Sequence, residues 1–253
     1  MGLEKLDIQR AKAMVNAASA VVVLTGAGVS TDSGVPDFRG PQGVWTKNPL
    51  TEKMSDIRYY MSDPDVRRLA WQSRLTHPAL RAIPNEAHDS IAAFEETGKL
   101  LKLITQNIDG LHQAAGSDHN KIIEIHGTIH RVVCMTCQKK TNMLDELERV
   151  KQGELDPLCS SCSGILKSDT ISFGQSLDEI KINAVFDCVK KIDLLLCVGT
   201  TLQVYPIAGV VDVAKAAHAD VLIINNQPTQ YDSMADAVLR DSIKVVLPVL
   251  LRS

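Results

Sequence analysis

The stretch AVVVLTGAGVSTDSG, residues 20–34, decides the fold class of this chain. Its first six residues are apolar and mostly β-branched, which predicts a short buried strand that ends at Gly26. The residues that follow open a loop, 26–43, that is dense in Gly, Ser, Asp and Pro. Glycines at such a point allow a tight turn and let backbone N–H groups approach a pyrophosphate.

The glycine pattern differs from the dehydrogenase fingerprint Gly-x-Gly-x-x-Gly. Thr31 occupies the third glycine position, no acidic residue closes a second strand about 20 residues later, and a Gly-Lys-Ser/Thr motif is absent. On the glycines alone, a plain tight turn and a dinucleotide loop remain equal alternatives. The motif PDFRG, residues 36–40, favours the dinucleotide loop, because its ring can cover a planar base and its charged groups can hold a ribose or phosphate.

Apolar strands alternate with helical segments over most of the chain, which predicts a parallel sheet with helices on both faces. The strands are expected at 20–25, 100–105, 121–125, 193–198 and 221–225, and the helices at 3–18, 51–61, 64–75, 86–97, 177–191 and 206–218. No element is assigned beyond residue 225. We predict one discontinuous α/β domain that two inserts interrupt. The domain comprises 1–43, 86–128 and 170–253, the helical insert 44–85 and the cysteine-bearing insert 129–169.

The chain has 253 residues, a formal net charge of −3 and 45% hydrophobic residues, which is a globular composition. The small negative charge excludes a generic polyanion binder, because a phosphate-binding surface needs clustered positive charge. No apolar run approaches the length of a membrane span, and the N-terminus lacks the apolar core and cleavage site of a signal peptide. We therefore expect a cytoplasmic protein, in which structural disulfides are rare.

Four of the six cysteines form two Cys-x-x-Cys pairs separated by 21 residues: Cys134, Cys137, Cys159 and Cys162. Two residues between cysteines let both thiolates reach one tetrahedral ion, so two pairs can close a Cys₄ shell around Zn²⁺. Such a shell leaves no position for water or substrate, which predicts a structural ion that also supplies folding energy. Two disulfides or four free thiols are the alternatives. Cys188 and Cys197 are expected in the core.

Polar clusters follow four of the predicted strands, where ligands bind in open parallel sheets. One such cluster is usually turn chemistry, but four on a shared edge indicate a site. They are Gln106-Asn107-Ile108-Asp109, His126-Gly127, Gly199-Thr200-Thr201 and Asn225-Asn226. Of the seven histidines, His126 is the best general-base candidate, because it stands at a strand end and imidazole titrates near neutral pH.

Together these motifs resemble those of the sirtuins, the NAD-dependent protein-lysine deacylases. The resemblance covers nearly the whole chain and rests on GAGVSTDSGVPDFRG (26–40), TQNIDGLH (105–112), IHGT (125–128), the paired Cys-x-x-Cys motifs and VGTTLQVYP (198–206). It implies a Rossmann-like large domain and a small domain made of a zinc ribbon and a helical module. NAD would be the co-substrate, Zn²⁺ a structural ion, and acyl-lysine proteins or peptides the substrates, with no nucleic-acid or membrane partner.

The resemblance also implies roles for single residues. His126, Asn107 and Asp109 would be catalytic, with His126 taking a proton from a ribose hydroxyl of NAD. The products would be free lysine, nicotinamide and O-acyl-ADP-ribose. The residues that bind NAD would be Gly26, Ala27, Gly28, Thr31, Asp37, Phe38, Arg39, Gln106, Asn107, Asp109, Gly199, Thr200, Thr201, Asn225 and Ile243.

Three segments depart from common patterns of the family. Gln175 stands where many members have Glu, and Ser168 replaces a proline, so the preference for basic residues around the substrate lysine is not carried over. Trp71-Gln72-Ser73-Arg74 stands where the desuccinylating branch has Tyr-x-x-Arg, and without the tyrosine we predict no preference for acidic acyl groups. The segment GPQGVWT, residues 40–46, resembles a branch with weak deacetylation, long-chain deacylation or mono-ADP-ribosylation.

Three rival functions remain at this point. The first is a protein mono-ADP-ribosyltransferase on the same scaffold. The second is a nicotinamide-dependent redox enzyme, against which Thr31 argues. The third is a zinc-ribbon nucleic-acid module, against which the mixed acidic and basic residues of the cysteine-bearing insert argue.

Overall fold

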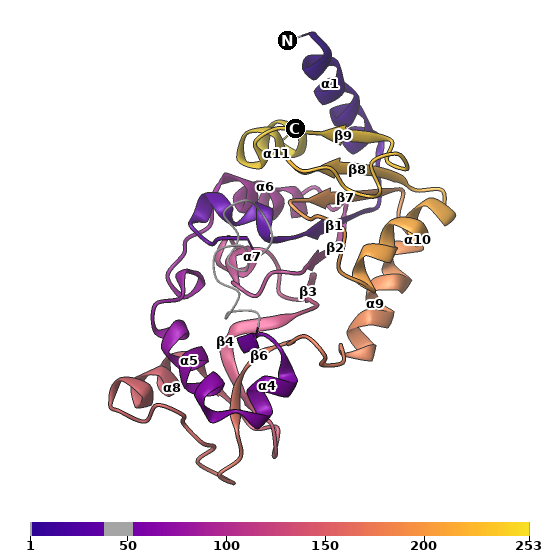
Figure 1. Ribbon diagram of the computed structural model, residues 1–253. Coiled ribbons are helices and arrows are strands. Elements are labelled where there is room, and N and C mark those ends of the chain that lie inside the picture. Colours follow the sequence, from indigo (N-terminus) through magenta and orange to yellow (C-terminus); the bar gives the residue numbers. More distant parts are fainter. Residues whose placement is uncertain (1, 38–52, 253) are drawn as a thin grey trace.

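The computed structural model describes residues 2–37 and 53–252, with side chains from residue 7 onward. Six parallel strands form its central sheet in the order β3-β2-β1-β7-β8-β9 (Figure 1). The chain adds β2 and β3 on one side of β1, and later adds β7, β8 and β9 on the other side. The topological switch point of the sheet therefore lies between β1 and β7. The strands are β1 Val21–Thr25, β2 Leu100–Thr105, β3 Ile122–Glu124, β7 Leu194–Val198, β8 Asp220–Ile224 and β9 Ala237–Leu239.

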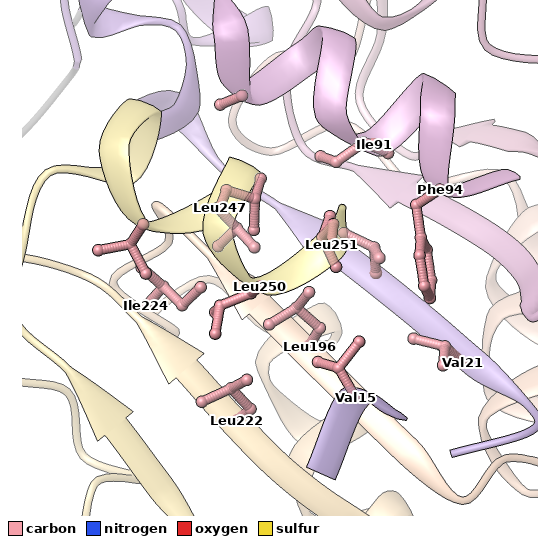
Figure 2. Close-up of a cluster of buried hydrophobic side chains, with 14 of the residues drawn as sticks. Val15, Val21, Ile91, Phe94, Leu196, Leu222, Ile224, Leu247, Leu250 and Leu251 are labelled. Carbon is pink, nitrogen blue, oxygen red and sulfur yellow. The ribbon is translucent and has the colours of Figure 1, made fainter. Parts of the chain in front are cut away.

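Side chains of the central strands alternate between two apolar layers, because successive residues of a strand point to opposite faces. Figure 2 shows the first layer, in which Val21, Leu196 and Leu222 pack against three helices. Those helices are α1 Gly2–Ala17, α6 Glu86–Glu95 and α11 Ile243–Leu251. On the other face Val22, Leu195 and Ile223 pack against α9 Glu179–Val189 and α10 Val210–Ala216. Both faces of the sheet are therefore covered.

A smaller antiparallel sheet has the order β5-β4-β6, with bounds β4 Gly127–Cys134, β5 Lys140–Asn142 and β6 Leu166–Thr170. Figure 1 places it, with three helices, at the end of the molecule away from α1. These helices are α4 Ile57–Ser62, α5 Pro64–Leu75 and α8 Met143–Lys151. Trp71, Met143 and Leu166 are buried in a shared core, so segments far apart in sequence pack as one lobe.

The predicted fold class, a Rossmann-like α/β sheet with a smaller ribbon and helical part, is confirmed. The boundaries of the two inserts stay a prediction. β9, α11 and the single turn α7 (Leu111–Ala114) were not predicted. α11 contains Pro248. Proline has no backbone N–H to donate within a helix, so its presence in a sequence argues against a helix at that position. Within the described ranges, no helix has both the length and the apolarity that crossing a membrane requires.

The loop after β1 lies directly against Gly199, the residue that follows β7. Gly26 N donates to Val198 O at 3.0 Å, and Gly28 N donates to Gly199 O at 2.9 Å. A Cβ on Gly199 would lie 2.5 Å from Val29 N, and the residue has φ +62°. A Cβ on Gly26 or Gly28 would come within 2.7 or 2.8 Å of Gly199 atoms. Glycine is therefore needed at all three positions for the two loops to touch.

Replacing Gly199 by Ala should destabilise the chain more than the same change at Gly98. Both glycines have positive φ, which costs an alanine about 1–2 kcal/mol, but only Gly199 is also crowded by backbone atoms. We expect Gly199→Ala to lower the free energy of unfolding by about 2–5 kcal/mol and Gly98→Ala by about 1–2 kcal/mol. Urea unfolding measures both, and equal losses would show that the contact with the β1 loop is unimportant.

Candidate active site and metal centre

The carboxyl ends of four adjacent strands bring most of the predicted polar clusters together. β2, β1, β7 and β8 are neighbours in the sheet, so the residues that follow them form a row along one edge. Gln106 N donates to Thr25 O at 3.0 Å, and Gln106 Nε2 donates to Thr200 Oγ1 at 2.8 Å. The loops after β2 and β7 thus meet beside the loop after β1. Open α/β sheets bind their ligands at this place.

Ser30 connects two of the predicted catalytic side chains. Its hydroxyl donates to Asp109 Oδ2 at 2.7 Å and accepts from Asn107 Nδ2 at 3.1 Å. Asn107 Nδ2 also lies 3.1 Å from Gly26 O, and Leu111 N donates to Asp109 Oδ1 at 3.0 Å. Both side chains are buried. The sequence analysis gave Ser30 no role, because nothing local distinguishes it from an ordinary turn serine.

Two buried histidines lie behind this group and also had no predicted role. The rings of His88 and His112 are 4.9 Å apart between centroids. His88 Nε2 is 3.4 Å from Ser30 Oγ, and His112 Nε2 is 2.9 Å from Thr25 Oγ1. Burial lowers the pKa of both, to about 3 for His112, where the neighbouring His88 adds to the effect. The pair is therefore neutral near pH 7 and acts as hydrogen-bonding support.

His126 has the geometry of a general base. Its Nδ1 lies 3.0 Å from the backbone carbonyl of Gln106. Because a carbonyl only accepts, Nδ1 carries the proton and Nε2 keeps its lone pair. Burial lowers the pKa of His126 below 6.5, although the bond to Gln106 O opposes this shift. The imidazole is therefore neutral and basic at Nε2 near neutral pH.

The remaining predicted cofactor residues lie at several places around the edge. Asn225 follows β8, is buried, and donates from Nδ2 to Gln227 O at 2.7 Å. Ile243 begins α11 and is buried in the first apolar layer. Thr31 and Asp37 line a hollow of about 300 Å³ beside the β1 loop. Ala27 and Thr201 belong to the loops after β1 and β7. Phe38 and Arg39, and the segment 40–46, lie outside the described residues.

The four predicted zinc ligands converge at the tip of the smaller sheet. Their sulfur atoms all lie within 4.8 Å of one another, with 3.5 Å between Cys134 and Cys162 and 3.7 Å between Cys137 and Cys159. These separations match the edge of a tetrahedron with Zn–S bonds of about 2.3 Å and exceed a disulfide bond of about 2.05 Å. Although burial opposes it, N–H donation from Cys137 and Thr136 lowers the pKa of Cys134 to about 6. The cluster therefore fits a structural Zn²⁺.

Arg74 of the Trp-x-x-Arg segment contacts other residues of the smaller lobe. Its guanidinium donates to Ser168 Oγ at 2.8 Å and lies 5.5 Å from the ring centroid of Trp71 and 5.9 Å from that of Tyr60. Ser168, one of the departures from the family pattern, is thus a partner of Arg74 on β6. Gln175, a second departure, forms a hydrogen bond within its own loop, since its Oε1 accepts from Ser172 N at 3.2 Å.

Known proteins resemble this chain in both sequence and fold. It is 45% identical over 232 residues to "NAD-dependent protein deacetylase 2" of Streptomyces coelicolor, which covers 92% of this chain and 96% of that protein. A solved Sir2 structure with a deacetylated p53 peptide and 3′-O-acetyl-ADP-ribose has a TM-score of 0.89 and 30% identity, covering 96% of this chain and 97% of that one. A second, with a p53 peptide and NAD⁺, has a TM-score of 0.85 and 30% identity, covering 95% of each chain.

A sequence profile of the Sir2 family matches residues 26–206, which include the glycine loop, the residues that follow β1, β2 and β7, His126 and all four clustered cysteines. The chain belongs to the Sir2 family.

Proposed function

We propose that this chain is an NAD-dependent protein-lysine deacetylase or related deacylase. It cleaves NAD to nicotinamide and transfers the acyl group of a modified lysine to ADP-ribose, giving O-acyl-ADP-ribose and free lysine. The observation that carries the proposal is that His126 binds the backbone carbonyl of Gln106 through Nδ1, in the same loop that carries the buried side chains of Asn107 and Asp109. The deacetylase activity for which the Streptomyces relative is named and the ligands of the two solved structures support it.

The residues along the carboxyl edge suit a dinucleotide co-substrate. Gly26 and Gly28 keep side-chain bulk away from the switch point, and polar side chains follow the neighbouring strands. In our assignment Gln106, Asn107 and Asp109 hold the nicotinamide and its ribose. Gly199, Thr200, Thr201 and Asn225 hold the phosphates and the adenosine ribose.

The protein's part in the chemistry is acid–base and electrostatic. When bound, NAD supplies a ribose carbon from which nicotinamide leaves as a neutral molecule. His126 Nε2 accepts a proton from a ribose hydroxyl, and Gln106 O stabilises the imidazolium that forms by accepting from Nδ1–H. A Zn²⁺ held by Cys134, Cys137, Cys159 and Cys162 would take no part in bond making, because the four sulfurs would complete its coordination.

Mass analysis of the products tests the proposal. The protein is incubated with NAD and a panel of acyl-lysine peptides, and free-lysine peptide and O-acyl-ADP-ribose are quantified together. We expect both products in equal amounts. ADP-ribose attached to protein without O-acyl-ADP-ribose would instead support the mono-ADP-ribosyltransferase.

A cytoplasmic location belongs to the same proposal. All six cysteines are free of disulfides, and four of them are close enough to share one metal ion. This arrangement suits a reducing compartment, where thiolates stay available as metal ligands.

His126→Ala should keep NAD binding and lose deacylation. The change removes the proposed base but leaves the loops that hold the co-substrate. We expect kcat to fall about 10²–10⁴-fold with little change in NAD affinity, measured by steady-state kinetics and calorimetry. His119→Ala, at an exposed turn position, is the matched control and should behave as the unmodified protein. An unchanged turnover number in His126→Ala would refute the assignment.

The pH profile should report the lowered pKa of His126. Burial disfavours the imidazolium, so the base becomes neutral at a pH below 6.5. We expect kcat/KM to rise with pH, to reach half its maximum below pH 6.5 and to be flat near neutrality. A midpoint above 6.5 would mean that a different group controls the acid limb.

Removal of zinc should destabilise the smaller lobe. The ion joins β4 to the strand-free segment around Cys159, and without it four sulfurs are left crowded together. We expect a chelator to release one zinc per chain, and Cys137→Ala to lower stability by about 3 kcal/mol or more, roughly 6–12 °C in Tm. Cys188→Ala is the control and should retain the metal. Full zinc content in Cys137→Ala would contradict the four-sulfur site.

A further inference from the structure

Residues 126–130 form hydrogen bonds with three backbone carbonyls of the loop that carries Asn107 and Asp109. His126 Nδ1 lies 3.0 Å from Gln106 O, and Ile129 N donates to Ile108 O at 2.9 Å. His130 Nε2 then lies 2.7 Å from Asp109 O. Three carbonyls of one short loop are thus bound by one short segment at the start of β4.

His130 also covers Gly110, the residue that turns this loop. Gly110 has φ +70°, and a Cβ there would lie 3.0 Å from Cδ2 and Nε2 of His130. A side chain at position 110 would therefore force the ring of His130 to shift by a few tenths of an ångström, and the positive φ also favours glycine there. Because Asp109 O only accepts, Nε2 of His130 carries a proton in the neutral and the charged ring alike.

The contact of His130 fixes the direction of the Asp109 side chain. The carbonyl of Asp109 is bound to His130, while its carboxylate is bound to Ser30 Oγ and Leu111 N. Rotation of the peptide between Asp109 and Gly110 would break the first bond and carry the turn away from His130. A side chain held from both ends in this way keeps a single orientation.

We propose that His130 is a positioning residue for the reaction and acts by fixing Asp109 and its loop against β4. This rests on the proposed function, in which Asn107 and Asp109 hold the nicotinamide side of NAD. His130 is exposed, so its imidazole contributes no apolar core packing and its removal opens no cavity in the core. Its effect should therefore appear in the use of NAD rather than in the stability of the fold.

The test compares His130→Ala with His130→Gln, because the Nε2 of a glutamine can replace the donor. We expect kcat/KM for NAD to fall about tenfold in His130→Ala, equivalent to about 1.4 kcal/mol. The KM for the acyl-lysine peptide should change less than about twofold and Tm by less than about 2 °C. His130→Gln should recover most of the loss, and His119→Ala, another exposed histidine, should show none.

Three results would overturn the proposal. They are an unchanged kcat/KM for NAD in His130→Ala, a loss that follows a comparable fall in Tm, and a glutamine variant no better than the alanine variant. Failure of the proposed function itself looks different. In that case the unmodified protein gives no O-acyl-ADP-ribose with any acyl peptide, before any variant is compared.

Discussion

The backbone of residues 26–29 lies directly against Gly199, and the rest of the site depends on that contact. It joins the loop after β1 to the loop after β7 across the switch point of the sheet. The loop after β2 then binds to both, since Asn107 Nδ2 donates to Gly26 O and Gln106 Nε2 donates to Thr200 Oγ1. A side chain at Gly199 would push these loops apart and remove the frame that holds Asn107.

Within that frame, the buried carboxylate of Asp109 is held by neutral donors. Burial of a carboxylate is costly unless hydrogen bonds replace its hydration, and Ser30 and Leu111 N supply two of them. His88 stands behind Ser30 and stays neutral because burial lowers its pKa. In the part of the chain that the structure describes, the hydrogen-bond partners of this carboxylate are therefore neutral, and the carboxylate can stabilise positive charge that develops on a ligand nearby.

The parts of this molecule that sequence predicts are those with a local signal. The predicted strands at the centre of the sheet are mainly apolar, because a parallel sheet is buried on both faces there, and the polar residues at their carboxyl ends stand out against them. β9 has only three apolar residues, between Asp236 and Arg240, and α11 contains a proline, so the signal of both is weak. Ser30 acquires its role from Asp109, 79 residues away, and from His88, 58 residues away. Only packing defines such partners.

The glycine loop has a local sequence signal and could be predicted, but the groups that it contacts are defined by packing and could not. Its motif indicates close backbone approach, and the approaching group could be a pyrophosphate or another loop of the protein. The N–H groups of Gly26 and Gly28 donate to Val198 O and Gly199 O, so the approach that these two glycines permit is to β7. These two N–H groups are therefore not free to bind a nucleotide at this edge, which leaves the other groups of the loops that the glycines bring together.

β4 extends this frame from the reaction site to the metal centre. His126 immediately precedes the strand, His130 lies within it, and Cys134 ends it. The zinc has no ligand position left for a substrate, so any influence on the reaction must pass through the protein. Residues 126–130 bind three carbonyls of the loop that carries Asn107 and Asp109, so His126 and that loop are held to the same end of β4. Any effect of a metal at Cys134 on His126 would therefore have to pass along this strand, because the metal itself would have no position for a substrate.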